Sequence, residues 1–181
     1  MRRDAEQRRD ALLRAAEDCF REFGYQVAFE TIARRAGVGR GTLYRNFKDR
    51  LALVVAIYHQ HLDRVETQVA GVADVERVLA AIIMAAGPME SLYSRLALDL
   101  MKDEEAFERF SDIEARVNAF LEPIVARAQA AGILRRDVGL DCMKLCVRMA
   151  GSIIKPSYTD AEADAVARQA LALLMDGLRP R

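Results

Sequence analysis

The feature that most constrains the fold is residues 31–48, where two short helical patterns flank a glycine turn. Residues four apart share one face of a helix, so each half of the stretch has a face to bury. Gly37 falls where a first helix of the pair would end. The stretch therefore predicts helices over about 29–36 and 40–46, packed closely through two apolar pairs: Ile32 with Ala36, and Leu43 with Phe47.

The rest of the chain also has helical spacing and lacks the alternating β-branched runs of strands. A first helix is expected from Arg9 to Phe23, and Asp49 predicts the N-cap of a long fourth helix that fades near Gly71. The fold class is therefore all-α with about nine helices. The sequence predicts an N-terminal three-helix domain over residues 1–48 and a larger helical domain over 49–181.

Capping boxes mark two later helix starts. Thr159 and Glu162 open a last helix expected over 160–178, and Ser111 and Glu114 have the same spacing. The segment from Asp103 to Gly132 is therefore expected to break near Phe110 and restart at Ser111.

Charge divides the chain unevenly, although its formal net charge is zero. Residues 1–50 hold 12 Arg or Lys and 8 Asp or Glu, and residues 51–181 hold 15 and 19. A basic N-terminal part suits a polyanionic partner. The N-terminus lacks a signal-peptide pattern, the longest apolar run has only nine residues (78–86), and the three cysteines form no framework spacing, so a cytoplasmic protein is expected.

The predicted helix over 40–46 has a polar and basic outer face, opposite the buried Leu43 and Phe47. In a helix-turn-helix, the second helix enters the DNA major groove. Arg45 can bind guanine through two hydrogen bonds, and Gly41 lets the backbone approach the groove. The alternative is a solvated charged helix, and Glu30 with Arg34 also forms an ordinary i,i+4 pair. The candidate DNA-binding residues are Arg34, Arg40, Gly41, Thr42, Tyr44, Arg45, Asn46 and Lys48.

Residues 9–51 resemble the DNA-binding domain of the TetR family of transcriptional regulators. Two departures are Ala28, where the family usually has a capping Thr or Ser, and Asn46, where histidine is common. The resemblance implies a homodimer on a palindromic operator, acting as a repressor that a small ligand releases. It is carried by Phe23-Gly24-Tyr25, Ile32-Ala33-x-x-Ala36-Gly37-Val38, Gly41-Thr42-Leu43-Tyr44-Arg45-x-Phe47-Lys48 and Leu51.

The second domain gives weaker signals. Residues 78–86 are apolar all round, so this helix should be enclosed and could form the wall of a cavity for a largely apolar ligand. Plain core packing is the alternative for each lining candidate. The candidate ligand-binding residues are Met84, Met89, Tyr93, Leu96, Phe107, Phe110, Phe120 and Met143.

The last two helices carry stripes of small and apolar residues that predict a dimer interface, with packing inside one protomer as the alternative. The candidate dimerisation residues are Val147, Gly151, Ile154, Ala167, Ala170, Leu171, Leu174 and Leu178.

No catalytic set, cofactor or metal site is expected. His59 and His61 point in different directions on one helix, and Cys142 and Cys146 are expected to be buried apolar residues rather than a redox pair. Two alternatives remain: an all-α small-molecule-binding protein or enzyme without a DNA role, and a regulator that answers to a protein partner.

Overall fold

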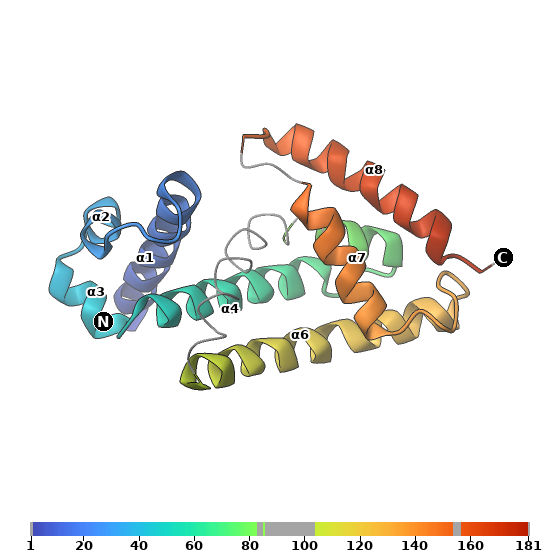
Figure 1. Ribbon diagram of the computed structural model, residues 1–181, viewed down its shortest axis with the longest axis horizontal. Helices are drawn as coiled ribbons and strands as arrows, with labels where there is room; N and C mark the ends of the chain where they lie inside the picture. Colours follow the sequence, from blue (N-terminus) through green and yellow to red (C-terminus); the bar gives the residue numbers. More distant parts are fainter. Residues whose placement is uncertain (1, 83–84, 86–103, 154–156, 181) are drawn as a thin grey trace.

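Helices form the regular structure of the described residues, which are 2–82, 85, 104–153 and 157–180 of the computed structural model (Figure 1). Residues 75–82 form one helical segment, and no strand occurs within the described ranges. The eight segments are close to the nine expected, and the all-α class is confirmed. The labelled helices are α1 (Arg2–Phe23), α2 (Phe29–Arg35), α3 (Arg40–Asn46), α4 (Arg50–Val69), α6 (Glu104–Ala130), α7 (Leu140–Ser152) and α8 (Asp160–Leu178).

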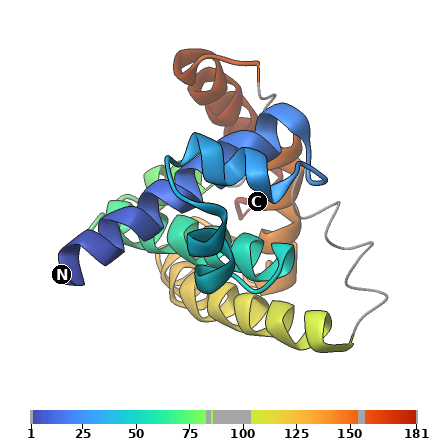
Figure 2. The same ribbon diagram turned by 90° about the vertical axis from the view of Figure 1, so that its left-hand side faces the viewer.

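Helices α1 to α3 and the first half of α4 share one apolar core, which we call the N-terminal core. Figure 2 shows these three helices in front of α4 and α6. The bounds of α2 and α3 agree with the predicted ones to within one residue, while α1 begins at Arg2 instead of Arg9. The largest side chains sealed in this core include Leu12, Ile32, Leu43 and Leu53.

A second apolar core, the C-terminal core, lies where α4, residues 75–82, α6, α7 and α8 meet. Helix α4 contributes to both cores, with Ile57 in the first and Val65 in the second. One continuous helix therefore joins the two cores. The domain boundary between residues 48 and 49 stays a prediction.

The predicted break near Phe110 is wrong, because α6 runs without interruption from Glu104 to Ala130. No glycine or proline stands between residues 104 and 122 to stop the helix. Ser111 and Glu114 are both exposed on its surface. Their spacing is compatible with a helix interior as well as with a helix start.

Other predicted helix starts are confirmed. The Asp49 side chain accepts a hydrogen bond from the Ala52 amide at 2.6 Å, and Thr159 and Glu162 form a reciprocal capping box at α8. Among the described residues, no helix is long and apolar enough to cross a membrane.

Candidate nucleic-acid interface

The turn between α2 and α3 is a helix C-terminus closed by glycine. The Val38 amide donates to the Ala33 carbonyl at 3.0 Å and the Gly37 amide to the Arg34 carbonyl at 3.2 Å, the paired bonds of a Schellman motif. Gly37 has a φ of +67°, a backbone conformation that side chains with a Cβ rarely adopt. This turn sets the angle at which α3 leaves α2.

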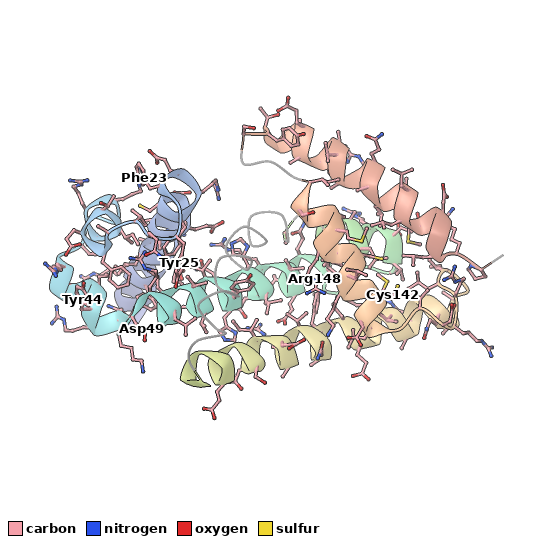
Figure 3. The ribbon with its side chains drawn as sticks, viewed as in Figure 1. Phe23, Tyr25, Tyr44, Asp49, Cys142 and Arg148 are labelled. Carbon is pink, nitrogen blue, oxygen red and sulfur yellow. The ribbon has the colours of Figure 1, made fainter. Side chains whose placement is uncertain are left out.

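Helix α3 is anchored through one face. Leu43 is 0% exposed and Phe47 is 3% exposed, and both belong to the N-terminal core. Most of the opposite face is open to solvent, and Figure 3 shows Tyr44 at the end of the molecule, far from Cys142 and Arg148. The predicted DNA-binding residues are exposed except for the half-buried Thr42: Arg34, Arg40, Gly41, Tyr44, Arg45, Asn46 and Lys48.

Two of these side chains lie back along their own helix. Arg45 donates from Nε to the Gly41 carbonyl at 3.1 Å and from one terminal nitrogen to Thr42 Oγ1 at 3.2 Å. Asn46 Nδ2 donates to the Thr42 carbonyl at 2.8 Å. All three bonds are solvent-exposed, so replacing them with contacts to DNA requires only side-chain rotation.

Arg40 is held across the turn. Its guanidinium lies 2.9 Å from Glu30 Oε1 and 5.4 Å from the centre of the Tyr44 ring. Glu30 therefore pairs with Arg40, whereas the sequence suggested a pair with Arg34. An exposed ion pair of this kind is weak, so a phosphate can displace the Glu30 carboxylate.

Two further arginines at this end of the molecule were missed from the sequence. Arg9 of α1 lies 5.2 Å from the centre of the Phe47 ring, which extends the basic surface of α3 toward α1. Its helical position gave no sign of this, because the contact depends on how α1 crosses α3.

Arg50, the first residue of α4, donates to the Tyr25 and Val27 carbonyls, the second at 2.8 Å. Its guanidinium also lies 5.2 Å and 5.3 Å from the ring centres of Tyr25 and Phe29. As predicted, Ala28 gives α2 no side-chain cap. Arg50 therefore fixes the turn that leads into α2, and it connects that turn directly to α4.

Polar contacts also join α4 to α1. His61 Nε2 lies 3.1 Å from Glu17 Oε2, and the two side chains are 14% and 12% exposed. The contact has an ion-pair distance, although the Nε2 atom makes no hydrogen bond of good geometry. Burial alone would raise the pKa of Glu17, but His61, Arg21 and Arg64 outweigh it and lower that pKa below its ordinary value.

Arg116 of α6 joins α4 on another side. One of its terminal nitrogens lies 2.6 Å from Asp63 Oδ1 and 2.8 Å from Glu66 Oε2, and the other lies 3.2 Å from His59 Nδ1. These carboxylates raise the pKa of Arg116, so it stays cationic. Helix α4 is therefore tied to α1 through His61 and to α6 through Arg116.

Most of the predicted ligand-binding side chains lie outside the described part of the chain. Phe107 and Phe110 belong to α6, but their side chains lie outside the described part of the chain. Phe120 is half-buried against the C-terminal core, and Met143 is buried within it. Four others lie outside the described residues: Met84, Met89, Tyr93 and Leu96.

The predicted dimerisation residues lie mainly inside the protomer, and Ile154 lies outside the described residues. Ala167 and Ala170 pack with Ala150 between α7 and α8. Other members of the set are buried or half-buried in the same region: Val147, Gly151, Leu171, Leu174 and Leu178. The apolar side chains that α7 and α8 expose are different ones: Leu145, Met149, Ile153 and Leu173.

Comparison with known proteins gives two family matches along the chain. Residues 12–57 match the bacterial regulatory proteins of the tetR family, and residues 76–180 match the C-terminal domain of SbtR-like transcriptional regulators. An HTH-type transcriptional regulator of Staphylococcus aureus (strain USA300) is 38% identical over 64 residues, which are 35% of each chain. The chain thus spans about a third of the length of the curated relatives it matches.

Solved structures match over almost the whole chain. The TetR transcriptional regulator SCO0520 from Streptomyces coelicolor is 31% identical, covers 95% of this chain and 98% of its own, and has a TM-score of 0.67. FadR from Bacillus subtilis, solved with stearoyl-CoA, is 18% identical with a TM-score of 0.64 and covers 93% and 98%, so it shows the fold alone. Since the two family matches together cover most of the chain, this protein belongs to the TetR family of bacterial regulatory proteins.

Proposed function

We propose that this protein is a dimeric, sequence-specific DNA-binding regulator, which represses transcription from a palindromic operator in the cytoplasm until a small molecule releases it. No enzymatic step is part of the proposal. Membership of a family of transcriptional regulators favours it over an all-α binding protein or enzyme without a DNA role.

The observation that carries the proposal is that α3 has one buried face and one exposed basic face. Leu43 and Phe47 lock one face into the N-terminal core, and the other face presents Arg40, Tyr44 and Arg45 to solvent. A rigid helix with exposed arginines suits the major groove, where arginine reads guanine. The exposed Lys48 and Arg9 extend this surface toward phosphates.

The dimer is proposed through the exposed apolar side chains of α7 and α8. Leu145 and Met149 of α7 and Ile153, its C-cap residue, are spaced by four, so they form one stripe. Leu173 of α8 is 70% exposed. Exposed stripes of this kind favour burial against a second copy. The residues predicted from the sequence then serve to hold α7 against α8 beneath that interface.

A small-molecule effector is proposed from the relatives. FadR from Bacillus subtilis was solved with stearoyl-CoA, and a protein from Saccharomonospora viridis was solved with choline. The Saccharomonospora viridis protein is 13% identical to this chain with a TM-score of 0.70, and the match covers 97% of this chain and 100% of that protein. These molecules are bound by those proteins, and they illustrate that the shared fold can hold a small molecule.

A competition gel shift tests the proposal. The probe is the DNA upstream of the protein's own gene, with unrelated DNA as competitor, at several salt concentrations. We expect a complex that survives competition and weakens steeply with salt, because each phosphate contact releases counterions. If neither this probe nor any other genomic fragment is retarded at low salt, the DNA-binding proposal fails.

A further inference from the structure

Three sulfur-bearing residues lie on one face of α7. Cys142 and Cys146 are four residues apart, and Met149 follows three residues after Cys146. Successive residues of a helix are turned by about 100°, so positions i, i+4 and i+7 fall within an arc of about 60°. The three side chains therefore leave α7 on the same side, along two turns of the helix.

The two cysteines of this face are close to each other. Both are free thiols; Cys146 is 9% exposed within the C-terminal core, and Cys142 is half-buried against the same core. Burial, followed by the charge of Cys142 and a hydrogen bond between the two thiols, raises the pKa of Cys146. The sulfur atoms are thus within hydrogen-bonding distance, and Cys146 is protonated at neutral pH.

Met149 brings a third sulfur atom to this face from the solvent side. It is 53% exposed, and its unbranched side chain has three rotatable bonds and a polarizable thioether. The thioether can turn toward the thiols without displacing a core residue. Figure 3 shows Cys142 near the start of α7. Because Cys142 is only half-buried, a small ion can reach the thiol pair from solvent.

Sulfur ligands of this kind select soft cations, of which Cu(I) is the common example. In the described ranges no group of three or more His, Cys, Asp or Glu side chains could hold a metal ion. That argues against Zn²⁺, which takes four nitrogen, sulfur or oxygen ligands. Cu(I) is satisfied by two thiolates in a line or by three sulfur atoms in a plane, and a thiol pair with a nearby thioether matches this requirement.

We propose that Cys142, Cys146 and Met149 form a binding site for one Cu(I) ion, with two thiolates and one thioether as ligands. Binding forms a Cu–S bond to each cysteine and releases both thiol protons to solvent, without oxidation or reduction. The bis-thiolate complex carries one negative charge, which the dipole at the start of α7 favours. The site goes beyond the proposed function and does not depend on DNA binding.

Competition with a coloured Cu(I) chelator tests the site. Fully reduced protein, freed of reductant and kept without oxygen, is titrated into the Cu(I) complex of bathocuproine disulfonate. The wild type should withdraw Cu(I), bleach the chelate and gain an ultraviolet thiolate-to-copper absorption band. Zn²⁺, offered from a zinc-sensitive dye, should be withdrawn far less. Failure of the wild type to withdraw Cu(I) overturns the proposal.

Variants of the three ligands locate the ion. Cys142→Ala and Cys146→Ala should each lose at least tenfold in Cu(I) affinity, because even outer-shell partners of a metal contribute about 10–100-fold. Met149→Leu keeps the apolar volume but removes the thioether, so it should lose affinity by a smaller factor. Unchanged affinity in Cys142→Ala or in Met149→Leu overturns the three-ligand site.

The third cysteine of the chain supplies a matched control. Cys19 is buried in the N-terminal core, and Cys19→Ala should bind Cu(I) like the wild type. A loss in Cys19→Ala as large as that in Cys142→Ala contradicts the assignment. Cys142 is half-buried, so Cys142→Ala keeps the test valid if the buried Cys146→Ala does not fold. The titration contains no DNA, so its result is independent of the gel shift.

Discussion

His61 of α4 and Glu17 of α1 are joined by a contact of 3.1 Å in a largely buried position between the two helices. Glu17 belongs to the helix that packs on α2, and His61 lies halfway along the helix that enters the C-terminal core. The pair therefore connects α1, which packs in the N-terminal core, to the helix that continues into the C-terminal core.

This contact makes stability depend on pH. The folded-state pKa of Glu17 is lowered, so the carboxylate stabilises the fold above its unfolded pKa, and that stabilisation is lost as pH falls through the folded value. Acidification from neutral pH to about pH 3 should lower the unfolding free energy less in Glu17→Gln than in the wild type, as measured by urea denaturation. The control is Glu122→Gln, an exposed position on α6. Equal pH dependence in the wild type and Glu17→Gln would contradict the assignment.

Arg50 should stabilise the turn before α2. Arg50→Ala removes two donated bonds to carbonyls and two ring contacts, so we expect a loss of about 2–3 kcal/mol in unfolding free energy. Arg50→Lys should retain part of the stabilisation that Arg50 provides. DNA affinity should fall in the same order, because the turn positions α2 and α3. Wild-type stability and affinity in Arg50→Ala would refute this role.

Leu43 and Tyr44 are adjacent in sequence but should differ in what they support. Leu43→Ala leaves a cavity in the N-terminal core and should lower the unfolding free energy by about 2–5 kcal/mol. Tyr44→Ala should change stability by less than about 1 kcal/mol and weaken DNA binding. Thermal denaturation and gel shift on both variants measure these two effects. A large loss of stability in Tyr44→Ala together with unchanged stability in Leu43→Ala would contradict the prediction.

The exposed stripe on α7 should set the oligomeric state. Met149 is 53% exposed, and Met149→Glu would place a charge in the proposed interface. Light scattering should show a dimer for the wild type and a shift toward monomer for Met149→Glu. The control Ala119→Glu is at an exposed position on α6 and should remain dimeric. A monomeric wild type would end the dimer proposal.

Local signals in the sequence were sufficient for α2, α3 and the start of α4, but not for the start of α1. Gly37 and the apolar pairs located α2 and α3, and Asp49 located the start of α4, because caps and helical periodicity act over only a few residues. The Ser111 capping pattern was misleading for the same reason, since a local pattern does not show whether the preceding residues leave the helix.

Contacts between distant segments were not predictable. The pairing of Glu30 with Arg40 depends on the angle of the turn between α2 and α3. The contacts of Arg9 and His61 depend on how α1 packs against Phe47 and α4, and those of Arg50 depend on where the turn before α2 meets α4. The apolar stripes of α7 and α8 were recognised, but spacing alone did not show which side faces the protomer's interior. Burial resolves this, because Ala167 and Ala170 are covered and Leu173 is not.

The most direct test of the account is the affinity of Arg45→Ala for the retarded DNA fragment, measured by competition gel shift beside the wild type. Arg136→Ala, at an exposed arginine in the turn between α6 and α7, is the control. If Arg45 reads a base, Arg45→Ala should weaken specific binding by about 1–3 kcal/mol and relax sequence preference. Unchanged affinity and sequence preference in Arg45→Ala would contradict the placement of α3 in the major groove.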